Sequence, residues 1–355
     1  MGFGQVVIGP PGSGKSTYCF GVQQFFKAIS RQVVMINLDP AVQDLSYEVD
    51  VDIRELVELE EVMQHNRLGP NGSVLFCLEY LEENFDWLVE KIQSACFRSG
   101  AEDGTRIEVD YIVMDLPGQV ELSTDHQSLQ KVLHRLEKLD WRLGVVQLTD
   151  STHIIDPAKY IAIVLLNLKA MLNLGMPHIN VLTKIDLLKN LGDQLKLNLD
   201  FYTEVQDLSY LLPILDDHTT PKFGKLNRVI IEMIEDFNLV GFETLCVEDK
   251  ASMTKLILAI DRAIGYYPSN KPKSNASTGE DLSKDDLESD KIRIEDLPME
   301  TILEVQERWI DYPELYQQHQ NECWDNEAQI VFDRETERSR LDAIQKNRSD
   351  RSPQD

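Results

Sequence analysis

The sequence predicts an α/β fold of three layers, with a mostly parallel sheet between two layers of helices. Short β-branched runs recur along the chain and are apolar throughout, as expected for strands that are covered on both faces. Longer segments with helical periodicity separate these runs, and a glycine-rich turn joins the first run to the first helix. In such folds, ligands bind at the carboxyl ends of the strands.

The strands are predicted from runs of four or five residues. Five are expected at residues 5–8, 32–36, 111–114, 144–148 and 179–182, and a weaker sixth at 243–247. Helices are expected at 16–30, 157–174, 222–237 and 251–265. Between the second and third strands, a helical insertion over about 51–97 is predicted as two helices without a strand, joined by a tight turn at 68–72.

Composition excludes several classes of protein. The 355 residues include 35 Lys and Arg against 61 Asp and Glu, a net charge of -26, and 42% are apolar, which is enough for a sizeable core. An acidic chain without a concentrated basic patch is a poor ligand for nucleic acid or anionic lipid, so neither is expected as a direct partner. The five scattered cysteines and a start without signal-peptide features favour a cytoplasmic protein, with shuttling to the nucleus left open.

The glycine-rich turn at residues 9–16, GPPGSGKS, matches the phosphate-binding motif G-x-x-x-x-G-K-[ST] in full, after a strand and before a helix. Its backbone N–H groups and the helix N-terminus would bind phosphate, Lys15 would reach the β- and γ-phosphates, and Ser16 would bind Mg²⁺. The fold is therefore predicted to be that of a P-loop NTPase. The nucleotide-binding residues expected here are Gly12, Ser13, Gly14, Lys15, Ser16 and Thr17.

A second motif follows the predicted strand at 111–114. Asp115 is expected to hold Mg²⁺ through water, Gly118 to turn its N–H onto the γ-phosphate, and Gln119 to orient the attacking water. This D-x-x-G-Q arrangement is typical of Ras-like and related GTPases. By itself, D-x-x-G is also common in ordinary turns.

Thr183-Lys184-Ile185-Asp186 is similar to the guanine-binding N-K-x-D loop, with Thr in place of Asn. Asp186 would accept hydrogen bonds from guanine N1 and N2, which adenine cannot donate, and Lys184 would lie along the ring and ribose. The alternative is that Lys184 and Asp186 only cap a helix start. The last loop on the guanine side should lie near residues 245–248, where the sequence is too plain to assign.

Together with these motifs, Asn37-Leu38-Asp39-Pro40-Ala41 and the Gly69-Pro70-Asn71 turn of the insertion make the chain resemble the GPN-loop GTPases over about residues 3–267. Segments 9–19, 199–205 and 207–212 are most similar to the second of the three eukaryotic paralogous branches. The part of the chain after residue 268 carries none of this resemblance.

The resemblance implies GTP and GDP as ligands with Mg²⁺, and a homodimer or a heterodimer with a paralogous GPN-loop GTPase. In the dimer, the turn formed by Gly69, Pro70 and Asn71 would reach the partner's γ-phosphate, and Asn71 would act on the developing charge or the attacking water. Asp39 would be a further carboxylate near Mg²⁺ or the water, or else a turn cap before Pro40. The catalytic residues expected are Lys15, Asp39, Asn71 and Gln119.

The implied cellular role is in the assembly and nuclear import of RNA polymerases, chiefly polymerase II with polymerase III as a second candidate, through polymerase subunits or assembly factors. Two alternatives stay open. One is a nucleotide-gated assembly scaffold whose hydrolysis is incidental, and the other is a P-loop ATPase or kinase.

Three regions are predicted along the chain: a GTPase domain at 1–267, an acidic polar linker at 268–291, and a partly helical C-terminal tail at 292–355. Apolar residues recur in the tail at roughly helical spacing, namely Ile302, Val305, Trp309, Leu315 and Tyr316. They predict a helix that either packs back on the body or binds a partner.

Overall fold

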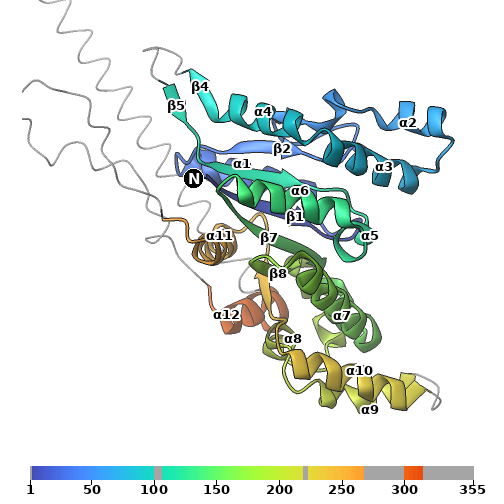
Figure 1. Ribbon diagram of the computed structural model, residues 1–355. Coiled ribbons are helices and arrows are strands. Elements are labelled where there is room, and N and C mark those ends of the chain that lie inside the picture. The colour runs from blue at the N-terminus through green and yellow to red at the C-terminus, as the bar shows by residue number, and fades with distance from the viewer. Residues whose placement is uncertain (1, 100–105, 219–222, 268–299, 315–355) are drawn as a thin grey trace, which may run out of the picture.

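The main sheet in the described part of this protein has seven strands, all parallel. The computed structural model describes residues 2–99, 106–218, 223–267 and 300–314. The strand order is β3-β2-β6-β1-β7-β8-β9 (Figure 1). The strands are β1 (Gly2–Ile8), β2 (Val34–Asn37), β3 (Val51–Asp52), β6 (Tyr111–Asp115), β7 (Trp141–Asp150), β8 (His178–Thr183) and β9 (Phe242–Leu245). A second, two-stranded sheet pairs β4 (Phe97–Ser99) with β5 (Arg106–Glu108) in antiparallel fashion. The predicted α/β class with a parallel sheet is confirmed, including the weak sixth strand.

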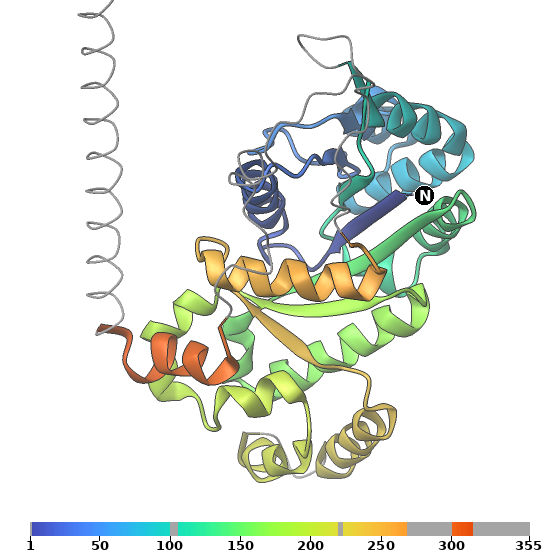
Figure 2. The same ribbon diagram turned by 90° about the vertical axis from the view of Figure 1, so that its left-hand side faces the viewer.

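Helices cover both faces of the sheet (Figures 1 and 2). They are α1 (Lys15–Ala28), α2 (Leu59–Asn66), α3 (Pro70–Glu83), α4 (Phe85–Cys96), α5 (Val120–Thr124), α6 (Gln127–Lys138), α7 (Pro157–Leu174), α8 (Leu199–Glu204), α9 (Leu212–His218), α10 (Gly224–Phe237), α11 (Lys250–Ile264) and α12 (Ile302–Gln306). The four helices predicted outside the insertion correspond to α1, α7, α10 and α11.

The insertion differs from the prediction of two helices without a strand. It contains three helices, α2, α3 and α4, and begins with β3, which pairs with β2 through Val51 and Asp52. The break between α3 and α4 falls at Asn84, which has φ -98° and ψ 35° and donates its side-chain amide to the Tyr80 carbonyl. Neither Gly nor Pro marks this break, and a two-residue strand has no periodicity to detect. The turn at 68–72 is where the sequence places it, between α2 and α3.

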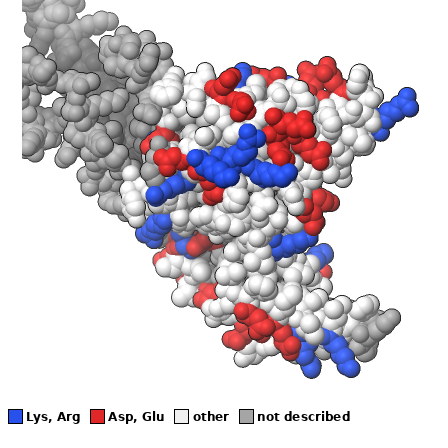
Figure 3. All heavy atoms as spheres, viewed as in Figure 1, with Lys and Arg blue, Asp and Glu red and all other residues white. Residues whose placement is uncertain are grey.

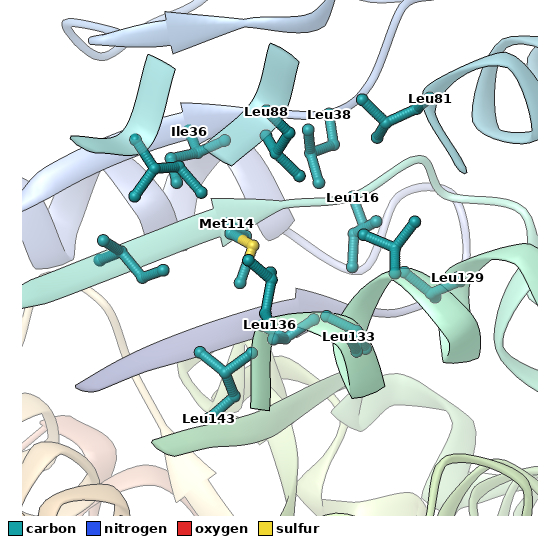
Figure 4. Close-up of a cluster of buried hydrophobic side chains, with 14 of the residues drawn as sticks. Ile36, Leu38, Leu81, Leu88, Met114, Leu116, Leu129, Leu133, Leu136 and Leu143 are labelled. Carbon is teal, nitrogen blue, oxygen red and sulfur yellow. The ribbon is translucent and has the colours of Figure 1, made fainter. Parts of the chain in front are cut away.

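The core is divided by the sheet into two faces. Alternate strand residues, such as Ile36 and Met114, pack with α3, α4 and α6 on one face (Figure 4). The residues between them, such as Val113, pack with α1 and α11 on the other. A third cluster joins α7, α8 and α10 to the β8 end of the sheet. Burial on both faces is the reason that the strands are apolar throughout.

Helix α7 is long and apolar enough to cross a membrane by length and composition alone. Its apolarity has another explanation, since Tyr160, Val164 and Leu168 lie in the third core cluster. On the face seen in Figure 3, basic side chains are interspersed with acidic ones. Lys169 of α7 forms an ion pair with Asp125 at 2.6 Å. These observations describe α7 as a core helix of the α/β fold.

The described part of the predicted tail packs back on the body. It forms α12 and a π-helical turn, η8 (Glu307–Asp311), and Val305 is buried in the third core cluster. Thr301 and Glu304 form a capping box at the start of α12. Leu315, Tyr316 and the linker at 268–291 lie outside the described residues, and the predicted boundaries of the three regions stay a prediction.

A half-buried histidine, His178, lies at the start of β8 with one of its ring nitrogens out of contact with solvent. The Nε2 atom of His178 lies 2.8 Å from Oε1 of Gln147, and its Nδ1 is buried without a partner among the described residues. Burial lowers the pKa of His178 to about 4. Because the unfolded chain takes up this proton near pH 6.5, protonation favours unfolding as the pH falls.

We expect the protonation of His178 to lower the free energy of unfolding by about 2 kcal/mol as the pH falls from 7 to 5. Denaturant unfolding across this range should show a smaller loss for His178→Gln than for the parent. His134→Gln changes an exposed histidine on α6 and should keep the parent's pH profile. Equal pH profiles for the parent and His178→Gln would contradict the assignment.

Candidate functional site

The parallel sheet brings the predicted site residues together, because five neighbouring strands end at the same edge. Asn37 at the end of β2 pairs in register with Asp115 of β6, and Val7 of β1 pairs with Asp115 from the other side. Asp150 of β7 pairs with Thr183 of β8. The loops after these strands carry every motif found in the sequence apart from the Gly-Pro-Asn turn, which lies in the insertion.

The phosphate loop joins β1 to α1. Gly12 and Gly14 have φ values of 78° and 90°, a left-handed conformation that favours glycine. Helix α1 begins at Lys15 with no side chain capping its first turn and no acidic residue in it. Its free N–H groups and the positive end of its dipole are therefore available to an anion.

Lys15 lies among carbonyls and carboxylates at the mouth of this loop. Its Nζ donates to the carbonyls of Gly9 and Pro10 at 3.2 and 3.4 Å. A Cβ atom at Gly118 would lie 2.8 Å from Nζ, so the second motif reaches the lysine directly. Burial lowers the pKa of Lys15, although the charges of Asp115 and Asp39 oppose this change. A phosphate group at this position would favour the charged ammonium.

The surroundings of Asp115 are suitable for binding Mg²⁺. Its Oδ2 accepts hydrogen bonds from Tyr47 at 2.8 Å and from Ser16 at 3.5 Å, whereas its Oδ1 is buried without a partner in the described part of the chain. Burial raises the pKa of Asp115 to about 6. A hard cation would use the open carboxylate oxygen and the Ser16 hydroxyl, with phosphate and water as the other ligands. Among described residues, no group of three His, Cys, Asp or Glu side chains could form a cage without them.

Asp39 makes the contact expected of a turn cap, and its role at Mg²⁺ or the attacking water stays a prediction. Its Oδ1 accepts a hydrogen bond from the Ala41 N–H at 2.9 Å, which makes it a turn cap. Its charge also acts on Lys15, and burial raises the pKa of Asp39. The carboxylate therefore lies near the phosphate-binding lysine while it holds the turn after β2.

The loop after β8 is tied to the phosphate loop by side chains. The Thr183 hydroxyl lies 2.8 Å from the Ser13 carbonyl and 3.1 Å from the Thr149 carbonyl. Lys184 Nζ donates to the Gly12 carbonyl at 2.6 Å and to Asp150 Oδ2 at 2.8 Å. A threonine in place of asparagine thus still connects the base-binding loop to the phosphate loop.

Asp186 lies in the first turn of the 3₁₀ helix η3 (Ile185–Asn190). Burial, followed by the charge of Asp186, raises the pKa of Cys246 to about 12. Cys246 directly follows β9, so the loop at residues 246–249 lies beside Asp186. This is where the sequence places the last loop of the guanine side, although no residue there could be assigned.

The Gly-Pro-Asn turn lies next to the second motif. Pro70 is at the start of α3, where its missing N–H costs nothing, and Gly69 precedes the helix. The exposed Asn71 Oδ1 lies 3.5 Å from Nε2 of Gln119 in the same chain, which is long for a hydrogen bond. The turn was expected to act at a partner's phosphate, and in the structure it also lies beside the chain's own glutamine.

Two residues of the site were missed from the sequence. Tyr47 reaches Asp115 from a loop that carries no motif, and no local signal could have found it. Asp150 binds Lys184 and caps the turn after β7 through Thr152. A polar residue at the carboxyl end of a buried strand was a signal that could have identified it.

The phosphate loop, the carboxylate after β6 and the base-binding loop after β8 define a P-loop nucleoside triphosphatase of the GTPase class. A family described as "Conserved hypothetical ATP binding protein" matches residues 7–266. The chain is 42% identical over 335 residues to GPN-loop GTPase 2 of Schizosaccharomyces pombe, covering 94% of this chain and 98% of that protein. It is 48% identical over 268 residues to GPN-loop GTPase QQT1 of Arabidopsis thaliana, covering 75% and 86%.

The fold is similar to that of an apo-form GTPase from Pyrococcus abyssi, with a TM-score of 0.57 and 25% identity, over 74% of this chain and 97% of that one. The chain belongs to the GPN-loop GTPase family, and several of its relatives are named GPN-loop GTPase 2. It is a GTP-binding hydrolase. The word ATP in the family description differs from the names of these relatives, which are called GTPases.

The hydrogen bond from Thr183 to the Ser13 carbonyl, which joins the loop after β8 to the phosphate loop, leads to a testable prediction. Thr183→Val keeps the shape of the side chain but loses the hydroxyl, and should weaken GDP binding about fivefold, the effect of one hydrogen bond. Thr183→Ser keeps the hydroxyl and should bind GDP nearly as well as the parent. Titration with a fluorescent GDP analogue measures both, and equal affinities for the two variants would show that the hydroxyl does not matter.

Proposed function

We propose that this GTPase hydrolyses GTP in a Mg²⁺-dependent reaction at the edge of the sheet between β2 and β8. The observation that carries the proposal is the convergence of Lys15, Ser16 and Asp115 at the mouth of the phosphate loop. Mg²⁺ bound by Ser16 and Asp115 would neutralise charge on the β- and γ-phosphates. The ligands are then GTP before the reaction and GDP after it.

The chain's own residues have distinct tasks in this proposal. Residues 12–17 bind the phosphates, and Lys15 stabilises the charge that develops on them. Asp186 and Lys184 select and hold guanine, with Thr183 fixing their loop to the phosphate loop. Gly118 directs its N–H to the γ-phosphate, and Gln119 orients the attacking water. Asp39 acts beside Lys15 on the same side of the phosphates.

A dimer completes the site in this proposal. Asn71 and Gln119 lie side by side, and Asn71 is exposed. A two-fold axis through such a surface places the same patch of both chains face to face, so that each Asn71 meets the other chain's Gln119 and phosphates. An amide there would stabilise charge or water without an arginine. The dimer is a homodimer or a heterodimer with a paralogous GPN-loop GTPase.

Mixing two inactive variants tests whether Asn71 acts across the dimer. Asn71→Ala should lower the GTP turnover rate about a hundredfold, and Lys15→Ala should abolish phosphate binding at its own site. In a mixture, a Lys15→Ala chain would supply its Asn71 to an Asn71→Ala partner, and random pairing would restore about a quarter of the parent rate. Phosphate release measures this rate.

The control variant is Asn66→Ala, an exposed asparagine at the end of α2, which should keep the parent rate. If Asn71 acts only on its own chain, through its contact with Gln119, the mixture will remain inactive. Full activity of Asn71→Ala alone would remove Asn71 from the mechanism.

For the cellular role, we propose that nucleotide-dependent opening of the dimer supports the assembly and nuclear import of RNA polymerase II, and of polymerase III as a second cargo. The resemblance to the family supports this proposal. It implies contact with polymerase subunits or assembly factors, and a cytoplasmic protein that can also enter the nucleus. Direct binding to nucleic acid or membrane is not part of it, in agreement with the net charge of -26.

Replacing the protein in its own cells tests this role. Depletion should leave the largest subunit of polymerase II in the cytoplasm by fluorescence microscopy, the parent chain should restore it to the nucleus, and Gln119→Ala should not. A subunit that stays nuclear after depletion would overturn the role. Full restoration by Gln119→Ala would favour a nucleotide-gated scaffold with incidental hydrolysis.

A further inference from the structure

The described part of the C-terminal region lies against the loops that surround the base-binding side of the site. We call residues 300–311 the C-terminal clamp. They comprise Glu300, Thr301, α12 and η8. Figures 1 and 2 show α12 beside α8 and close to α11, far along the chain from the segments that it touches. Gln306 fixes it there by accepting a hydrogen bond from the Leu199 N–H at 3.1 Å.

One contact of the clamp is with the segment that carries Asp186. Val305 is buried in the same cluster as Ile185 and Leu188, which lie on either side of Asp186 in η3. Ile310 packs on Gly192 so closely that a Cβ atom there would lie 3.0 Å from its Cγ2. The clamp therefore packs directly on η3 and on the turn that follows it.

The other contact is with the loop at residues 246–249. The Arg308 guanidinium, whose side chain is 9% exposed, donates to Asp249 Oδ1 at 3.2 Å and to Glu300. Asp249 in turn accepts a hydrogen bond from the Ser252 N–H at 2.9 Å. The Ser252 hydroxyl accepts from the Cys246 N–H at 3.0 Å, so both ends of the loop are held.

These two contacts hold the two loops that are expected on the guanine side of the site. Thr183 at the end of β8 pairs in register with Leu245 at the end of β9, which places the two loops next to each other. A loop that must be ordered when the ligand binds loses affinity, whereas one already held in position does not. A buried guanidinium that loses its partners is costly, so the pair formed by Arg308 and Asp249 resists opening.

We propose that the C-terminal clamp positions the two guanine-side loops and thereby sets the affinity and selectivity for guanine, with Arg308 as the positioning residue. The proposal rests on Asp186 as the residue that reads guanine. It gives the described part of the tail a role at the nucleotide site of its own chain. The nucleotide and the C-terminal region would then be coupled: guanine binding holds the clamp closed, and displacement of the clamp releases nucleotide.

The test compares Arg308→Gln with the parent and with Arg228→Gln, an exposed arginine on α10. We expect Arg308→Gln to weaken GDP binding about tenfold, with faster dissociation, and Arg228→Gln to leave it unchanged. The decisive measurement is the ratio of the affinities for GTP and ITP, which lacks the N2 amino group of guanine. This ratio should fall toward that of Asp186→Ala, because a displaced loop loses the N2 contact.

A purely structural role would lower the melting temperature and weaken GTP and ITP equally, and that result would overturn the proposal. The proposal would also be overturned if Arg308→Gln kept the parent's affinity for GDP and the parent's ratio of affinities for GTP and ITP. If Arg308→Gln does not fold, Ile310→Ala removes the contact with Gly192 and should shift the ratio in the same direction; an unchanged ratio there also overturns it. If Asp186→Ala keeps the parent ratio, the assignment of the guanine-reading residue fails instead.

Discussion

Burial of the parallel sheet on both faces is the constraint on which the rest of this protein depends. Strands covered by helices on each side must all run in one direction between crossover helices, so their carboxyl ends meet at one edge. Four residues of the site come from different segments of the chain, namely Lys15, Asp115, Asp150 and Thr183. Hydrogen bonds join the loops that carry them: Ser16 donates to Asp115, Thr183 to the Ser13 carbonyl, and Lys184 to Asp150. The site is a consequence of the topology.

This edge concentrates charge in a partly buried place, and the electrostatics there favour a particular ligand. Burial raises the pKa of Asp115 and lowers that of Lys15, because removal from water disfavours the charged form of each group. A phosphate with its cation reverses both effects, because it supplies the opposite charge to each. A chain with a net charge of -26 can thus bind a polyanion, since the binding depends on local N–H groups and one lysine.

The two additions to the P-loop fold lie at opposite ends of this edge. The insertion places Asn71 beside Gln119, at the end where the γ-phosphate would lie. Residues 300–311 lie behind the base-binding loops, at the other end. Each addition therefore contacts a loop that carries residues of the candidate site. Both segments are anchored in the core, the insertion through α3 and α4 and residues 300–311 through Val305.

The sequence by itself determined the α/β class, six of the seven strands and the motif residues, because these depend on local patterns: apolar runs, glycine at positive φ, and short polar motifs at strand ends. Only the tertiary structure decided which distant residues meet. Tyr47 lies 68 residues from Asp115, and Arg308 lies 59 residues from Asp249. The strand β3 and the break at Asn84 were missed because pairing with β2 and packing of α4 fix them, and neither leaves a local periodicity.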